Sequence, residues 1–285
     1  MTRFLVLGAS GMAGHLIATY LLERGHDVTG FCRRRAPGIR CIEGDAFDVE
    51  RLRTTVKEGG YDILVNAVGI LNRDAEDHKA RAAYLNAYLP HALAAMTEGT
   101  CARVFHMSTD CVFQGNAGPY AEDSVPDGKT FYDRSKALGE IDDDKNLTFR
   151  NSVIGPDTHP DGIGLLNWFM AQNGAVKGFS NVLWTGLTAL ELAKAMEAAA
   201  MEDAAGLVNM VPPASISKCE LLQLFNRHFR GGRVSVEPIE VPVLDKALVR
   251  TRCVCSFEPA SYDRQVAELA DWTRAHAHLY PHYDL

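Results

Sequence analysis

The sequence lacks several features that mark specialised classes of protein. Its 285 residues contain no block of lysine and arginine, and the formal net charge of −7 argues against non-specific binding to nucleic acid. No apolar run is long enough to cross a bilayer, so we expect no membrane partner. Glycines break the apolar run near the N-terminus, so we expect no secretory signal.

Cysteine is present, but not at the spacings of a metal site or a disulfide framework. The seven cysteines are odd in number and scattered, and no Cys-x-x-Cys pair occurs. This use of cysteine favours a reducing compartment, the cytoplasm. Near the C-terminus, His276, His278 and His282 have spacings that fit no metal motif. We therefore expect no metal site.

A glycine-rich turn near the N-terminus lies between two segments of regular structure. Residues 3–7 predict a strand, and the amphipathic segment from Leu16 to Glu23 predicts a helix. Gly8, Gly11 and Gly14 suit a tight turn, close approach of a pyrophosphate and close packing of the helix on the strand. Unpaired N–H groups at the start of such a helix attract an anion. The stretch predicts a dinucleotide site, with a structural turn as the alternative.

Strand and helix signals alternate through the first half of the chain. We expect strands at 26–32, 40–43, 62–69 and 103–107, with helices between them, and a further helix from Thr188 to Ala200 with Glu191 in its capping box. The alternation predicts an α/β fold with a doubly wound parallel sheet of the Rossmann type. The pattern loosens after residue 155. We therefore expect a dinucleotide-binding domain at 1–155 and a smaller, interleaved substrate-binding part at 156–285, with a segment near 181–200 returning to the first domain.

The second expected strand ends in arginines. In NAD-selective sites an acidic residue about 20 positions beyond the glycines binds the ribose hydroxyls. Arg33 and Arg34 stand there instead, and a guanidinium suits the 2′-phosphate of NADP. A solvated basic loop is the alternative.

Polar and small residues follow the third and fourth expected strands. Asp45 is the better candidate for the adenine amine, and Asp48 the better cap for the helix that follows. Small residues after the fourth strand would let a cofactor lie against backbone. The expected cofactor contacts in this half are Gly8, Ser10, Gly11, Met12, Gly14, Arg33, Arg34, Asp45, Ala46, Ala67, Val68 and Gly69.

Three groups with catalytic potential follow the fifth expected strand. Thr109 lies at the carboxyl end of that strand, where open parallel sheets bind ligands, although it could equally cap a helix. Tyr132 and Lys136 are four residues apart and share a helix face. The ordered combination with the glycine turn is more specific than any of these signals alone.

These motifs resemble the extended short-chain dehydrogenase/reductase family. The resemblance rests on the three glycines, Asn66 to Gly69, Ser108 to Asp110, and Tyr132-x-x-x-Lys136 in this order and spacing. The stretches 107–115 and 132–140 look like the dTDP-4-dehydrorhamnose reductase branch, and 186–193 looks like its sugar-nucleotide-binding relatives. The resemblance is good over about the first 155 residues.

The resemblance implies that NADPH reduces a 4-keto group on a nucleotide-activated 6-deoxyhexose, for surface polysaccharide synthesis. Tyr132 would donate the proton, Thr109 would orient the keto oxygen, and Lys136 would hold the nicotinamide ribose and lower the pKa of Tyr132. The resemblance adds Tyr132, Lys136, Ser152 and Val153 as cofactor contacts. It also places Asp110, Cys111, Phe113 and Trp184 at the sugar.

Two residues depart from the family pattern. Cys111 stands where tyrosine is frequent, and Asp133 where glycine is frequent, which leaves the sugar and the nucleotide open. A nucleotide-sugar epimerase or dehydratase is one alternative function. A non-catalytic, cofactor-binding regulatory subunit is another, which the complete set of Thr109, Tyr132 and Lys136 disfavours. A homodimer also remains open.

Overall fold

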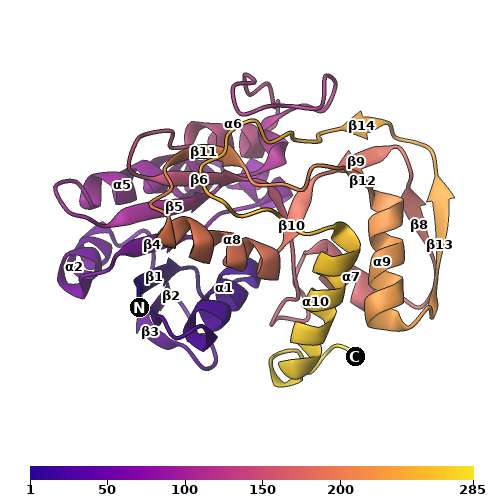
Figure 1. Cartoon of the computed structure of the whole chain (residues 1–285), viewed down its shortest axis with the longest axis horizontal. Helices are drawn as coiled ribbons and strands as arrows, with labels where there is room; N and C mark the ends of the chain where they lie inside the picture. Colours follow the sequence, from indigo (N-terminus) through magenta and orange to yellow (C-terminus); the bar gives the residue numbers. More distant parts are fainter.

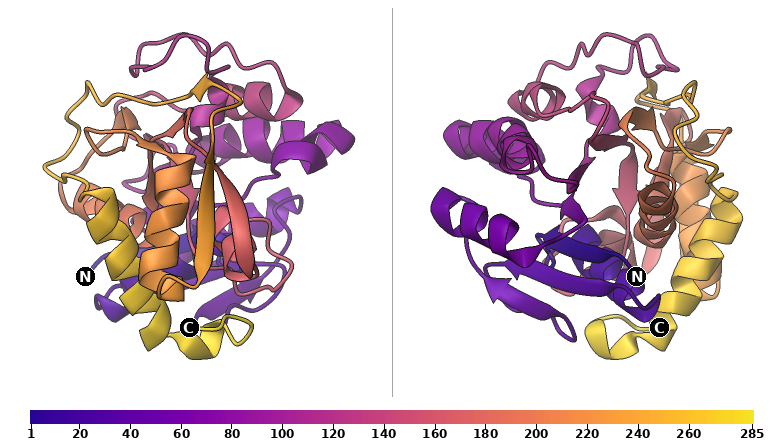
Figure 2. Two further views of the ribbon diagram at one scale, coloured as in Figure 1. Left: turned by 90° about the vertical axis from the view of Figure 1, so that its right-hand side faces the viewer. Right: turned by 60° about the vertical axis from the view of Figure 1, so that its left-hand side comes forward.

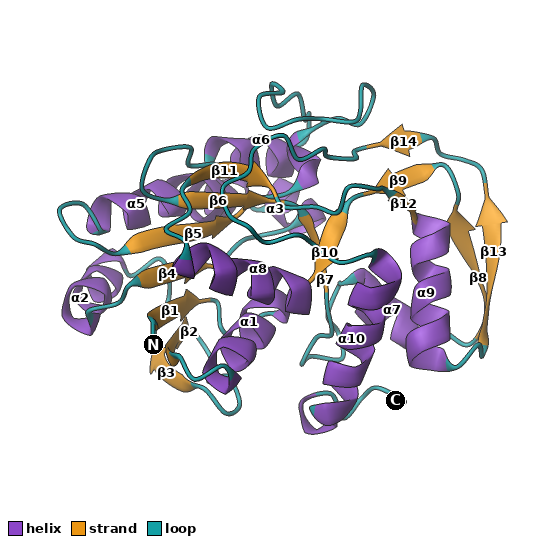
Figure 3. Cartoon of the chain, in the orientation of Figure 1, coloured by secondary structure: helices purple, strands orange, loops and turns teal.

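The computed structural model describes residues 1–285, and a seven-stranded parallel sheet lies at its centre (Figures 1 and 3). The strands run in the order β11-β6-β5-β4-β1-β2-β3, so the chain reverses direction across the sheet beside β1. Their bounds are β1 Arg3–Leu7, β2 Asp27–Cys32, β3 Arg40–Glu43, β4 Ile63–Asn66, β5 Arg103–Met107, β6 Leu147–Arg150 and β11 Gly206–Asn209. The expected doubly wound sheet is confirmed, and such sheets bind ligands where the strand order reverses.

Helices cover both faces of this sheet. One face carries α1 (Met12–Glu23) and α8 (Ala189–Met201), which pack on each other. The other carries α2 (Val49–Gly59) and α5 (Leu89–Met96). Side chains of β1 alternate between these two layers, because Phe4 and Val6 join one core and Leu5 and Leu7 the other.

The second half of the chain adds three small sheets beside the large one. Two of them have two strands each: β7 (Ser152–Ile154) pairs with β10 (Gly186–Thr188), and β8 (Gly174–Phe179) pairs with β13 (Val234–Ile239). The third has three strands, with β9 (Val182–Trp184) between β12 (Ile216–Ser217) and β14 (Leu244–Asp245). Helix α9 (Lys218–Arg230) lies against β8 and β13, and α10 (Tyr262–Ala275) lies beside α9 (Figure 2). The remaining short elements are α3 Asn72–Asp77, α4 Lys79–Ala82, the π-helix η1 Ala83–Tyr88, the 3₁₀ helices η2 Asp110–Val112 and η3 Ala277–Leu279, α6 Phe131–Leu138 and α7 Leu165–Met170.

Several boundaries differ from those expected. Helix α1 begins at Met12 instead of Leu16, because the backbone is already helical directly after Gly11. The helical segment between β4 and β5 is not one regular α-helix, because the π-helical turn η1 precedes α5. Glu191 does not complete a capping box, because Gln265 already accepts the hydrogen bond from the backbone N–H of Thr188.

The C-terminal residues contact the helix that follows the glycine turn. His15, buried in α1, lies 2.7 Å from the Tyr280 hydroxyl, and the Tyr283 hydroxyl accepts a hydrogen bond from the Asp157 backbone. His276 pairs with Glu23, and no group of three or more metal-ligating side chains converges in the structure. None of the helices combines the length and apolar character needed to cross a bilayer.

Candidate active site

The glycine turn forms a tight bend in which each glycine has its own steric reason. Gly8 has φ +80°, a conformation that favours glycine. A Cβ on Gly14 would lie 2.2 Å from the Gly8 carbonyl oxygen, so only glycine allows α1 to pack this closely. A Cβ on Gly11 would meet only that same oxygen, at 3.4 Å. The backbone at Gly11 therefore borders open space, where a ligand can approach.

The start of α1 is free to receive an anion. Gly11 is the N-cap residue and supplies no side-chain acceptor, and the first turn contains no acidic residue. The first N–H groups of the helix therefore lack side-chain partners, and the helix dipole adds partial positive charge there.

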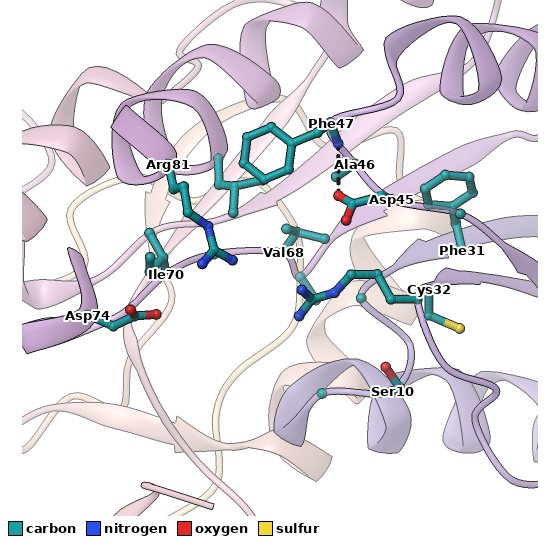
Figure 4. Close-up of a pocket in the computed structure, with 17 residues that line it drawn as sticks. Ser10, Phe31, Cys32, Asp45, Ala46, Phe47, Val68, Ile70, Asp74 and Arg81 are labelled. Atoms are coloured by element: carbon teal, nitrogen blue, oxygen red, sulfur yellow. Dashed lines mark hydrogen bonds between the residues drawn. The ribbon is translucent and has the colours of Figure 1, made fainter. Parts of the chain in front are cut away.

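A cleft extends from this bend along the carboxyl ends of the strands (Figure 4). The predicted cofactor residues that line it are Gly8, Ser10, Gly11, Arg33, Asp45, Ala46, Ala67, Val68 and Gly69. The cleft is also lined by residues that were not predicted, namely Phe31, Cys32, Gly44, Phe47, Ile70, Asp74, Arg81 and Leu85. Phe31 and Cys32 end β2 and could have been found from the strand boundary, whereas nothing in the sequence singles out Arg81. Arg81 extends toward the cleft from the side opposite Cys32 (Figure 4).

The other predicted cofactor residues do not line this cleft. Gly14 lies beneath the bend, Met12 approaches Gly155, and Arg34 is exposed at the surface. Ser152 and Val153 form β7, and the Ser152 hydroxyl donates a hydrogen bond of 2.6 Å to Asp110. Contacts of these residues with a cofactor stay predictions.

The two aspartates after β3 have separate positions. Asp48 accepts a hydrogen bond of 3.0 Å from the Arg51 backbone, which confirms it as the cap of α2. Asp45 accepts one from the Phe47 backbone in a local turn and lines the cleft. Beside it the Phe47 ring stacks on Tyr84 with centroids 4.7 Å apart, which gives this end of the cleft an aromatic wall.

Tyr132 and Lys136 both project from α6, whose first turn is held by three side chains. Thr130 and Asp133 form a reciprocal capping box, so Asp133 stabilises the helix start where relatives often have glycine. Glu76 of α3 adds a carboxylate that accepts hydrogen bonds from the backbone N–H groups of Phe131, at 2.6 Å, and Tyr132, at 3.2 Å. Glu76 was not predicted, because no local pattern connects it with a helix that begins 55 residues later.

Tyr132 is buried against Ile70, one of the residues that line the cleft. Only 7% of Tyr132 is exposed, and it packs with Ile70, Ala75 and Ala82. Burial and the Cys111 thiol raise the pKa of Tyr132, whereas the Thr109 hydroxyl opposes the rise. The phenol is therefore protonated at neutral pH.

Thr109 caps the short helix η2 and also lies beside Tyr132. Its hydroxyl donates to Asp110 at 3.1 Å and accepts from the Cys111 backbone at 3.2 Å, at the start of η2. The structure thus brings Thr109 and Tyr132 together at the carboxyl end of β5, as the sequence predicts.

Lys136 differs from expectation in what it does to Tyr132. Its ammonium donates to the Met107 carbonyl oxygen at 2.5 Å and lies 3.4 Å from Nε2 of His106. Burial lowers the pKa of Lys136 to about 8, and the carboxylate of Glu140 opposes this shift. The expected lowering of the Tyr132 pKa by Lys136 is not found, because burial and the Cys111 thiol act most strongly on the phenol and the Lys136 ammonium is bound to the Met107 carbonyl oxygen.

The four predicted sugar contacts fall into two pairs. Asp110 and Cys111 lie beside Tyr132, and burial raises the pKa of the Cys111 thiol to about 12. Phe113 is fully buried and stacks on Tyr120 with centroids 4.1 Å apart. Trp184 is 2% exposed and belongs to the core, which leaves little of either ring for a sugar to touch.

Comparisons with known proteins identify the family of this chain. Residues 2–149 match the RmlD substrate binding domain family. The chain is 32% identical over 139 residues to the "Probable low-salt glycan biosynthesis reductase Agl14" of Haloferax volcanii, covering 47% of this chain and 46% of the relative. It is 34% identical over 140 residues to dTDP-4-dehydrorhamnose reductase of Streptomyces griseus, covering 48% and 43%. The matches thus span about half the length of these curated relatives.

A solved structure extends the likeness of fold to nearly the whole chain. The dTDP-4-dehydrorhamnose reductase of Bacillus anthracis, in complex with NADP, superposes with a TM-score of 0.79 at 16% identity, over 96% of this chain and 100% of that one. The family match covers the glycine bend, the cleft and the helix that carries Tyr132 and Lys136. This chain belongs to the RmlD substrate binding domain family, within the extended short-chain dehydrogenases/reductases.

Proposed function

We propose that this protein uses NADPH to reduce the keto group of a nucleotide-activated 4-keto-6-deoxyhexose, for surface polysaccharide synthesis. The observation that carries the proposal is that Thr109 lies beside Tyr132, which packs against Ile70, a residue that lines the cleft from the glycine bend, while Lys136 follows on the same helix as Tyr132. The similarity to a probable glycan biosynthesis reductase and to a dTDP-4-dehydrorhamnose reductase supports the substrate class. The seven unpaired cysteines support a cytoplasmic location.

The residues present fit a dinucleotide. The open space at Gly11 and the uncapped start of α1 suit its pyrophosphate, and Asp45 with the aromatic wall suits its adenine. Arg33 lines the cleft near the end of β2 and would bind a 2′-phosphate, which favours NADP over NAD. Lys136, at the end of β5, would hold the nicotinamide ribose.

The chain's own residues then supply the proton and the orientation. A bound nicotinamide would supply the hydride for the keto carbon. Tyr132, protonated at neutral pH, would transfer its phenolic proton to the keto oxygen. Thr109, whose hydroxyl donates to Asp110 in this structure, would turn toward the same oxygen and fix its position. The phenolate of Tyr132 then regains a proton before the next turnover.

The test is NADPH consumption with a panel of nucleotide 4-keto-6-deoxy sugars, with product stereochemistry read by NMR. We expect Tyr132→Phe to abolish turnover while NADPH affinity stays near the wild-type value. Tyr88→Phe, at a residue that is 55% exposed, is the matched control and should behave as wild type. Unchanged turnover in Tyr132→Phe would refute the proposed role.

Two further measurements separate the alternatives. Arg33→Ser should raise the KM for NADPH and leave the KM for NADH unchanged. Purified protein that carries non-exchanging NAD would favour an epimerase or dehydratase. NADPH binding without turnover on any keto sugar would favour a regulatory subunit.

A further inference from the structure

His106 is a buried histidine of β5 to which the proposed reaction gives no role. It lies directly opposite Asn66 in the register of β5 with β4, and both side chains are fully buried. Nδ1 of its imidazole lies 3.2 Å from Nδ2 of Asn66, and Nε2 lies 3.4 Å from Nζ of Lys136. The imidazole therefore connects the end of β4 with the lysine of α6.

The amide of Asn66 has a defined orientation. Its Oδ1 accepts a hydrogen bond of 3.2 Å from the backbone N–H of Val68, a residue that lines the cleft. A backbone N–H can only donate, so the oxygen of the amide must be the atom that faces it. The amide nitrogen, which only donates, is then the atom that faces His106.

This orientation determines which nitrogen of His106 carries the hydrogen. Burial lowers the pKa of His106 well below its usual value, so the imidazole is neutral and has one donor and one acceptor nitrogen. Because Nδ2 of Asn66 donates to Nδ1, Nδ1 is the acceptor and the hydrogen lies on Nε2. The N–H of His106 is thus directed at Nζ of Lys136.

An N–H directed at the nitrogen of a lysine favours the neutral amine. An ammonium has three donors and no acceptor, so it would face the N–H of His106 as donor against donor. A neutral amine has a lone pair that can accept from Nε2 of His106, while one of its two N–H groups donates to the Met107 carbonyl oxygen at 2.5 Å. Only with the neutral amine does every contact from Val68 to Lys136 pair one donor with one acceptor.

Two other titratable groups act on this pair. The Glu140 carboxylate favours the ammonium of Lys136, but it forms no ion pair with it and is bound by Arg150 at both oxygens, at 2.8 and 2.6 Å. His91 acts on the imidazole of His106, but it is exposed and its ring binds the carbonyl oxygen of Leu138. The direct contact with His106 therefore acts on Nζ at shorter range than either group.

We propose that His106 is a positioning residue for Lys136, in that it directs an N–H at the lysine nitrogen, favours the neutral amine and leaves one N–H of that amine for the cofactor. This proposal rests on the proposed function, in which Lys136 would hold the nicotinamide ribose. Its consequence is a lysine that gains and loses a proton close to neutral pH, where acid–base groups are most effective. A solvated lysine stays protonated until about pH 10.

The first test is the position of the ring hydrogen of His106 in the wild-type full chain. The ¹⁵N chemical shifts of the ring separate a nitrogen that carries hydrogen from one that does not, and through-bond correlations assign them without any variant. At about pH 9, above the usual pKa of histidine, we expect the hydrogen on Nε2. A hydrogen on Nδ1 would overturn the proposal, since Nε2 would then accept from Lys136.

The second test is the pKa of Lys136, read from the ¹³C shift of its Cε atom in wild type, His106→Gln and His91→Gln. In His106→Gln the amide oxygen can replace the N–H and accept from the ammonium, so we expect the pKa of Lys136 to rise by about one pH unit or more. His91→Gln, at the exposed neighbour, should match wild type. An unchanged or lower pKa in His106→Gln would overturn the proposal, because a purely structural histidine would alter the melting temperature alone.

Both spectra are recorded without cofactor, substrate or turnover. An absence of NADPH consumption with every keto sugar would refute the proposed function. It would leave the ring hydrogen of His106 and the pKa of Lys136 to be decided by the spectra.

Discussion

Replacing Gly14 with alanine tests the close packing of α1 beneath the glycine bend. The added methyl carbon would lie 2.2 Å from the Gly8 carbonyl oxygen and 2.8 Å from its carbonyl carbon, and both are backbone atoms that cannot rotate away. Overpacking of this kind destabilises by about 1–3 kcal/mol. For a chain of this size we expect the melting temperature to fall by roughly 2–10 °C. The bend would shift with the helix, so NADPH affinity should fall as well.

Gly11→Ala is the matched variant, because its methyl group would meet only one atom, at 3.4 Å. Alanine is a weaker N-cap than glycine, which lowers the free energy of unfolding, but it also reduces the entropy of the unfolded chain, which raises it. We therefore expect the free energy of unfolding to change by less than about 0.5 kcal/mol. The methyl group would stand where the pyrophosphate approaches, so NADPH affinity should fall at least tenfold. Urea denaturation and fluorescence titration with NADPH measure the two quantities. If Gly11→Ala binds NADPH normally, or Gly14→Ala is as stable as wild type, the bend is not the cofactor site described above.

Three further predictions concern the supports of the site. Glu76→Gln removes a charge from the start of α6 and should lower the free energy of unfolding by about 0.3–1 kcal/mol. Because Tyr132 would be misplaced, kcat should fall about threefold to tenfold. Asp77→Asn, on the same short helix, should leave kcat unchanged, and an equal effect of both variants would refute a positioning role. Asn86 binds the N–H and C=O of Ile70, so Asn86→Ala should lower the free energy of unfolding by about 2–4 kcal/mol in urea, with the exposed Asn181→Ala as a near-neutral control. Burial lowers the pKa of Lys136 to about 8, so above that pH the folded protein releases a proton that the unfolded chain retains until about pH 10, and this group adds stability as pH rises. Between about pH 8 and 9.5, the free energy of unfolding of Lys136→Met should therefore rise less with pH, or fall more, than that of wild type. Identical slopes in the two proteins would contradict the lowered pKa of Lys136.

Local signals in the sequence were sufficient for much of the fold. The strands at residues 3–7, 40–43 and 103–107 have the expected bounds, because each contains apolar residues and is followed directly by glycine or serine. Asp48 was found as a cap, since a capping side chain bonds within three residues of itself. The π-helical turn at Ala83–Tyr88 was not found, because its cause is tertiary: Asn86 turns inward to the backbone of Ile70.

The site was predictable only as far as its motifs extend. Thr109 and Tyr132 meet as expected, because strand ends and helix faces fix their directions. Glu76 accepts hydrogen bonds at the start of the helix that carries Tyr132, and no spacing rule connects the two residues. Phe113 and Trp184 show the opposite failure. An aromatic residue beside a motif has the same sequence signal whether it contacts a ligand or fills the core.

The outermost strand of the large sheet, β11, comes from residues 206–209, and α8 on its face from 189–201. A fragment that ended at residue 155 would therefore expose β6 as a bare sheet edge and uncover apolar surface on α1, which invites association between copies. Laboratory dissection into separate halves should thus give insoluble material. An exchange of substrate-binding parts between relatives would have to retain these two inserted segments as a pair, while replacing only the sequence that lies around them.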